Sequence, residues 1–131
     1  MKKTLLIILL LIAFKSGVNA QSTAIVQGTL NEIKVKAAPL GLTFDLVTLK
    51  SNAQELQNIN PTYLQYLDIS FYEEQVDENN VKLTAAVTYK KSAEESTRIL
   101  LRYFISNNIS LVKIETNTYN TEEFFNNHLQ N

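Results

Sequence analysis

The residues of this chain that could do chemistry are chiefly carboxylates, because the 131-residue sequence has one histidine and no cysteine. Without cysteine the chain can form neither a thiolate metal site nor a Cys–His nucleophile pair. The histidine, His128, stands near the end of the sequence, where a frayed terminus would not hold an imidazole for a Ser–His–Asp triad. We interpret His128 as a surface residue and expect no catalytic, metal or cofactor site.

Pairs of neighbouring acids are the other candidates for general acid–base chemistry. They are Glu73-Glu74, Asp77-Glu78, Glu94-Glu95 and Glu122-Glu123. The two carboxylates of a glycosidase must face one cleft, about 5 to 10 Å apart. Neighbours along a strand point to opposite faces of a sheet, and three of the pairs flank expected turns or a helix start. We interpret these acids as solvated turn charges.

The first 20 residues have the pattern of a cleavable secretion signal. Two lysines precede a ten-residue apolar run that begins at Leu5, and Val18 and Ala20 occupy the −3 and −1 positions of a small-residue exit. A bilayer span needs about 20 apolar residues, so this run is too short to serve as an anchor. We expect cleavage after Ala20, a secreted or periplasmic protein, and no transmembrane span after signal removal.

The remaining 111 residues, 21–131, are expected to form one globular domain. Signal removal takes away three of the 12 basic residues and no acid, which leaves 9 basic against 13 acidic side chains and a net charge of −4. No stretch gathers Lys and Arg into the basic surface that nucleic-acid binding needs, so we expect no such partner. A small exported chain without cysteine favours a bacterial envelope, since small secreted eukaryotic domains usually rely on disulfides.

The second half of the chain has the period-two apolar pattern of β-strands. The four expected strands cover residues 67–71, 81–89, 97–106 and 109–118. A polar stretch, 76–80, is typical of a hairpin loop between the first two. Asn107-Asn108 is expected to form a two-residue type I′ turn between the last two, because asparagine tolerates positive φ. The segments together predict an antiparallel meander.

The register of the last expected hairpin defines a candidate contact surface. One face of that hairpin is almost wholly apolar, and the other mixes charged and apolar side chains. The mixed face consists of Arg98, Leu100, Arg102, Phe104, Leu111 and Lys113. Apolar groups rimmed by charge often mark contacts, and arginine is enriched among binding hot spots. The alternative is that a helix covers Leu100 and Phe104, in which case this face is core.

The first half of the chain leaves the choice between helix and strand open. Residues 23–37 and 43–57 each fit an amphipathic helix, yet each also contains alternating apolar residues. We prefer helices in both segments. Asn60-Pro61 has the form of an N-cap followed by proline and predicts a short helix, and residues 121–129 fit a final amphipathic helix.

These elements predict an α+β domain, with N-terminal helices packed on a four-stranded antiparallel β-meander and a short C-terminal helix. The layout is similar to that of cystatin-like and NTF2-like domains by analogy of architecture alone, because the sequence carries no residue motif of either family.

Three functions are open. The first is a non-catalytic protein that binds another envelope or extracellular protein. The second is a carrier that holds a small lipophilic ligand in an apolar cup between helices and sheet, and the third is a hydrolase that uses Asp or Glu alone. We favour the first, because no set of polar groups converging on one cleft can be assembled from this sequence. A protein binder should combine a filled core with an exposed apolar patch, whereas a carrier should have an internal apolar pocket.

Overall fold

The computed structural model describes residues 22–35 and 41–129, and it has the predicted α+β class. The strands are β1 (Ser22–Val26), β2 (Gly41–Leu49), β3 (Leu67–Gln75), β4 (Asn80–Tyr89), β5 (Ile109–Ile114) and β6 (Asn117–Asn120). The helices are α2 (Leu30–Val35), α3 (Lys50–Gln57), α4 (Ala93–Ser106) and α5 (Thr121–Phe124). A single 3-10 turn, η1 (Tyr63–Gln65), precedes β3, and a π-helical turn, η2 (Phe125–Leu129), follows α5.

The described strands form one mixed sheet of six in the order β3-β4-β2-β1-β5-β6. β1 and β5 pair in parallel, and the other neighbours pair antiparallel. The predicted four-stranded antiparallel meander is therefore wrong in strand number and in orientation. The error arises because β1 and β2 come from the segments for which helices were preferred, and because 97–106 adds no strand.

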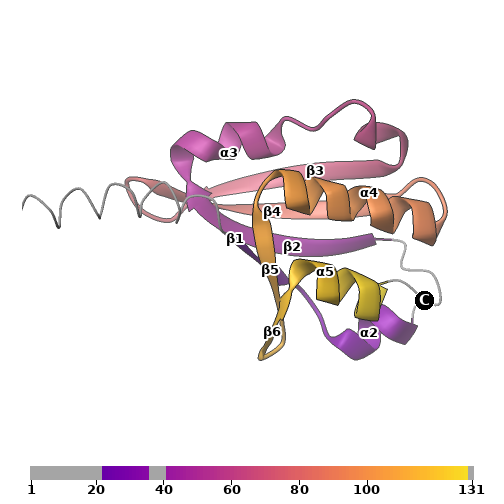
Figure 1. The fold of residues 1–131 in the computed structure, drawn as a ribbon. Coiled ribbons are helices and arrows are strands. Elements are labelled where there is room, and N and C mark those ends of the chain that lie inside the picture. Colours follow the sequence, from indigo (N-terminus) through magenta and orange to yellow (C-terminus); the bar gives the residue numbers. More distant parts are fainter. Residues whose placement is uncertain (1–21, 36–40, 130–131) are drawn as a thin grey trace, which may run out of the picture.

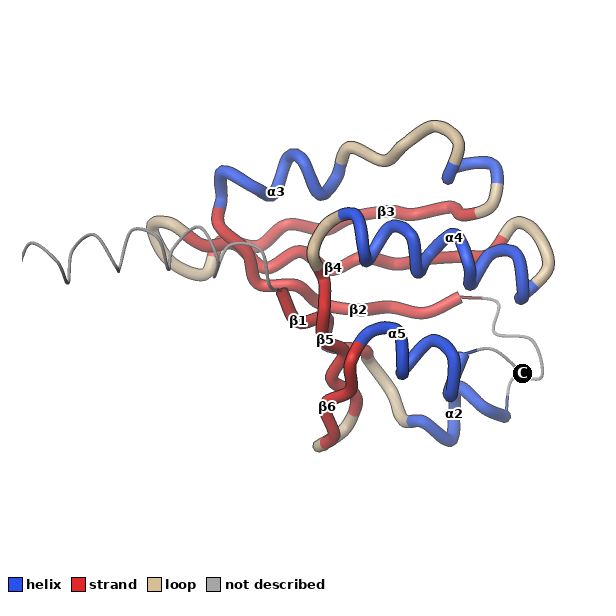
Figure 2. Tube along the Cα trace, viewed as in Figure 1, coloured by secondary structure: helices blue, strands red, loops and turns tan. Residues whose placement is uncertain are grey.

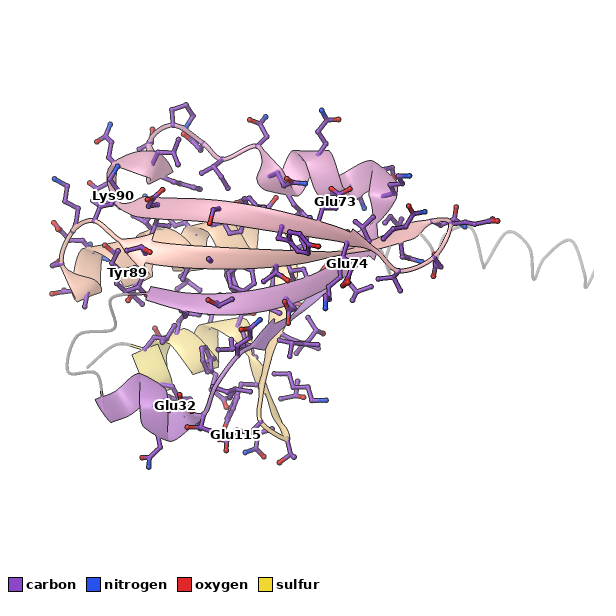
Figure 3. The ribbon with its side chains drawn as sticks, turned by 180° about the vertical axis from the view of Figure 1, so that it is seen from behind. Glu32, Glu73, Glu74, Tyr89, Lys90 and Glu115 are labelled. Carbon is purple, nitrogen blue, oxygen red and sulfur yellow. The ribbon has the colours of Figure 1, made fainter. Side chains whose placement is uncertain are left out.

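The described helices lie on one side of this sheet. α4 and α5 lie side by side across one face, with α3 and η1 along the β3 side and α2 beside α5 (Figures 1 and 2). Seen from the opposite side, β2, β3 and β4 lie in front, and no described helix crosses them (Figure 3). We call the helix-covered side the inner face of the sheet and the opposite side the outer face.

The alternation of residues in β2 separates these two faces. Leu42, Phe44 and Leu46 are buried on the inner face, so the intervening Asp45 and Val47 point to the outer face. β2 pairs with β1 on one side and β4 on the other, which satisfies its backbone as a central strand. The helix preferred for 43–57 is therefore wrong up to Leu49 and correct from Lys50, where α3 begins. The helix preferred for 23–37 is likewise wrong in β1 and correct in α2, and residues 36–37 lie outside the described residues.

Residues 93–106 form helix α4, so the predicted strand 97–106 is wrong. Ser92 is the N-cap: its Oγ accepts a hydrogen bond from the N–H of Glu95 (3.2 Å) and lies 3.2 Å from that residue's Oε2. The buried side of the helix has the spacing i, i+1, i+4, i+5 of a helical face. Its large apolar residues are Ile99, Leu100, Tyr103 and Phe104. The same run also alternates, and this alternation misled the sequence interpretation.

Asn107 and Asn108 end helix α4 and do not form a hairpin turn. Asn108 has a positive φ of 58°, as expected, but Asn107 has a φ of −105°, so the type I′ assignment is wrong. The N–H of Asn108 donates to the carbonyl of Ile105 (3.1 Å), which closes the last turn of the helix. The hairpin of this region lies further on, within the predicted strand 109–118, where Glu115 (φ 56°) turns β5 into β6.

Other local predictions are confirmed. β3 and β4 form the expected hairpin, and in its loop Asp77 Oδ1 accepts hydrogen bonds from the N–H groups of Asn79 and Asn80 (2.9 Å each). The hydrogen bond from Asn79 is the main cause that lowers the pKa of Asp77 below its ordinary value. Asn60 Oδ1 accepts a hydrogen bond from the N–H of Thr62 (2.9 Å), but the short helix predicted there is present only as the three-residue 3-10 turn η1. The final helix is present as α5 and η2.

Aromatic rings fill the layer between the inner face and the helices. Phe44 of β2 meets Phe104 of α4 edge to face with ring centroids 4.9 Å apart, and Phe104 meets Phe125 of η2 at 5.1 Å. These three rings are almost completely buried. Strand, helix and C-terminal turn are thus joined in one core.

Candidate functional site

The six residues of the predicted contact surface do not share one face. Arg98 and Arg102 are exposed on the outward side of α4, and the Arg98 Nη2 lies 3.3 Å from Glu94 Oε1. Leu100 and Phe104, at 0% and 1% exposure, belong to the core beneath that helix. Both residues belong to the core because α4 is itself one of the helices that cover the sheet. The alternative drawn from the sequence had instead placed them on a strand beneath a covering helix.

Leu111 and Lys113, the other two members of the predicted surface, lie on β5. They alternate with the buried Val112 and Ile114, so they point to the outer face of the sheet. The sheet therefore separates them from Arg98 and Arg102. Of the predicted surface, only this pair belongs to the outer face described below.

The neighbouring acids of β3 diverge. Glu73 and Glu74 are neighbours on β3 and point to opposite faces of the sheet (Figure 3). Glu73 Oε1 accepts a hydrogen bond from Gln57 Nε2 of α3 (3.0 Å), while Glu74 Oε1 lies 3.4 Å from Lys82 Nζ on β4.

Within residues 22–35 and 41–129, no three His, Asp or Glu side chains gather closely enough to hold a metal ion. None of the helices described there is long and apolar enough to cross a membrane.

His128 packs against two aromatic rings and is half-buried, whereas the sequence suggested an ordinary surface residue. Its ring centroid lies 4.9 Å from that of Tyr119 and 5.8 Å from that of Phe124. Its Nδ1 is buried and has no hydrogen-bond partner among the described residues. The imidazole thus packs as an aromatic group in the C-terminal turn.

The outer face of the sheet carries exposed apolar side chains. Ile25 of β1, Val47 of β2 and Leu111 of β5 are 43%, 53% and 37% exposed, and Tyr72 of β3 is 66% exposed. Ile25, Val47 and Leu111 alternate along their strands with residues buried on the inner face. Tyr72 lies on the outer face as well, where it pairs with Thr84 of β4. Single exposed apolar residues are ordinary, but here four lie on one sheet face that no described helix covers.

Strand register arranges the outer face in rows. The middle row follows the pairing of the described strands from β3 to β6 and contains Tyr72, Thr84, Asp45, Ile25, Lys113 and Thr118. Ile25 thus has Asp45 on one side and Lys113 on the other. Val47 lies two residues beyond Asp45 on β2, and Leu111, which pairs with Thr23 of β1, lies two residues before Lys113 on β5.

Polar contacts hold one of these charges in place. Asp45 Oδ1 accepts a hydrogen bond from Thr84 Oγ1 (2.6 Å), and Asp45 Oδ2 accepts one from Gln27 Nε2 (3.4 Å). Lys113 is exposed and makes no ion pair with any residue that the structure describes. The face therefore presents an oriented carboxylate and an ammonium group on either side of an exposed isoleucine.

The sequence interpretation found Leu111 and Lys113 but missed Ile25, Asp45 and Val47. Those three lie in the two segments for which helices were preferred, and a helix would not place alternate residues on one face. The alternation itself was the signal that could have found them.

Comparison of the chain with protein-family models, with curated proteins and with solved structures finds no match.

Proposed function

We propose that this chain is an exported, non-catalytic domain that binds another protein chain through the outer face of its sheet. The observation that carries the proposal is the set of exposed apolar side chains on a sheet face that none of the described helices covers, with charged residues among them. The set consists of Ile25, Val47, Tyr72 and Leu111. Apolar groups surrounded by charged and polar ones are typical of contact surfaces.

The packing of the interior favours this function over a carrier. The rings of Phe44, Phe104 and Phe125 occupy the layer between helices and sheet in which a lipophilic ligand would have to lie. A ligand there would have to displace well-packed side chains, which costs free energy. The divergence of Glu73 and Glu74 likewise gives a hydrolase no paired carboxylates at that position.

Affinity capture from the envelope fraction of the native host tests the proposed surface. The double change Ile25→Thr and Val47→Thr replaces two exposed aliphatic groups while keeping β-branched residues in the strands. We expect this variant to keep the melting temperature of the parent protein and to lose the captured partner. Ile105→Thr is the matched control, because Ile105 is 50% exposed on α4, away from the outer face. Undiminished capture by the double variant would contradict the proposal.

Export is tested separately by the intact mass of the protein recovered from that fraction. Cleavage after Ala20 would leave Gln21 as the first residue. A mass that still contains residues 1–20 would contradict the export proposal and leave the binding proposal standing.

A further inference from the structure

We infer that the partner which binds the outer face is a second copy of this chain, packed sheet against sheet about a two-fold axis that runs along β1. The inference rests on the proposed function, since it names the partner of the same surface. Two facts carry it: the charges on either side of β1 are opposite, and the apolar residues on either side of β1 match.

The charge arrangement selects the axis. A two-fold axis along β1, midway between two facing sheets, places β2 of one copy opposite β5 of the other, because these strands flank β1. Asp45 and Lys113 lie in the same row, on either side of Ile25. Asp45 of each copy then faces Lys113 of the partner subunit, and the symmetry makes this pair twice.

The apolar residues match under the same operation. Val47 lies on β2, two residues from Asp45, and Leu111 lies on β5, two residues from Lys113. Both are on the same side of the row that contains the two charges. Val47 of one copy then faces Leu111 of the partner subunit, while Ile25 lies at the axis and meets its own counterpart. Neutral hydroxyl groups meet as well, since Thr84 of β4 comes opposite Thr118 of β6.

The other in-plane axis is disfavoured. An axis across the strands through the row of Ile25 would set Asp45 against its own counterpart and Lys113 against its own counterpart. Like charges placed in direct opposition destabilise a contact. Of these two arrangements, only the axis along β1 pairs opposite charges.

Shape also suits a second copy. Two identically twisted sheets related by such an axis keep their strands aligned, which is the usual geometry of face-to-face sheet packing. With the axis along β1, the overlap covers the five strands from β4 to β6, and β3 lies outside it.

Charge reversal with mixing tests the inference. In purified Asp45→Lys, lysines face each other across the axis, and in purified Lys113→Asp, aspartates do. We expect the parent protein to have the mass of two copies by light scattering and each variant that of one. An equimolar mixture of the two variants should form a heterodimer by native mass spectrometry, since each lysine of one chain then faces an aspartate of the other.

A control and a second pair keep the outcome decisive. Arg102→Asp reverses a charge on α4, away from the outer face, and should leave the mass at two copies. Asp45→Lys loses the hydrogen bonds from Thr84 and Gln27, so its folding is checked by circular dichroism. If it does not fold, Val47→Lys mixed with Leu111→Asp replaces the pair, because these exposed residues also face each other across the axis.

The outcomes separate this inference from the proposed function. A parent protein with the mass of one copy, or a mixture that forms no heterodimer from two folded monomeric variants, overturns the two-fold arrangement. If the double change Ile25→Thr and Val47→Thr still abolishes capture of a different protein, the outer face remains the contact surface and only the second copy is wrong. If the parent protein is monomeric and that capture is unaffected, both proposals fail.

Discussion

The phenolic hydroxyl of Tyr103 donates a hydrogen bond of 2.6 Å to the backbone carbonyl of Leu56, and both residues are buried. Tyr103 lies on α4, and Leu56 lies in the last turn of α3, where carbonyl groups have no partner within the helix. The bond therefore satisfies an otherwise unpaired acceptor and ties the two helices together over the inner face of the sheet.

Tyr103→Phe should lower the free energy of unfolding by about 1 to 2 kcal/mol, because it leaves the buried carbonyl of Leu56 without a donor. Denaturant midpoints measure the change. Tyr72→Phe is the matched control, since Tyr72 is 66% exposed and its hydroxyl is free to bond with water. An equal effect of the two substitutions would show that the hydrogen bond contributes nothing.

The stability of the fold should decline in alkaline solution, and Tyr103 should account for part of the decline. Burial raises the pKa of the Tyr103 phenol above the ordinary value of 10.0. The folded state then keeps a proton that the unfolded state releases, so this stabilisation is present below pH 10 and is lost as the pH rises above it. Unfolding free energies measured across this range should decline less steeply in Tyr103→Phe. Burial also raises the pKa of Tyr89, opposed in part by its hydrogen bond with Thr97, so some slope should remain.

Asn108→Gly should be neutral or stabilising, whereas Asn108→Val should destabilise by about 1 kcal/mol or more. The reason is the left-handed conformation of Asn108 (φ 58°) at the end of α4, which glycine adopts freely and a β-branched residue resists. Melting temperatures of the two variants give the comparison. Valine tolerated as well as glycine would mean that the helix does not end in this conformation.

Ser92→Ala should cost about 1 kcal/mol, because Ser92 Oγ accepts the hydrogen bond of the Glu95 N–H at the start of α4. Ser70→Ala on β3 serves as control, since Ser70 is exposed on the outer face and should change stability little. Chemical denaturation measures the free energy of unfolding of both variants. Equal losses would show that Ser92 does not act as a cap.

Gly41→Ala should destabilise strongly, by about 3 kcal/mol, at the upper end of ordinary single substitutions. A Cβ atom at Gly41 would lie 1.8 Å from the carbonyl oxygen of Val87 on β4, and a backbone atom cannot give way without disturbing the pairing of β2 with β4. Thr43→Ala, two residues along β2, is the control for loss of a side chain in the same strand. A folded, parent-like Gly41→Ala would show that the two strands are not so close at this point.

Local signals in the sequence determined several parts of the structure. The alternation over 67–71 and 81–89 and the polar loop between them predicted the β3–β4 hairpin, because a half-buried strand imposes a period of two on its own residues. Asn108 was correctly expected to have a positive φ, since asparagine tolerates this conformation wherever the chain needs it. The final helix was likewise predicted from its own apolar spacing.

Only the tertiary structure decided what 97–106 and 41–49 become. Both segments contain apolar residues that fit a period of two and a helical period, so local pattern could not choose between strand and helix. β2 is a strand because β1 and β4 pair with it on both sides, and α4 is a helix because its buried side, with Leu100 and Phe104, covers the inner face.

The candidate surface depended on these choices, since Ile25, Asp45 and Lys113 come from three strands separated in the chain. Only the pairing of those strands brings them into one row, because the contacts that align them are made between distant segments.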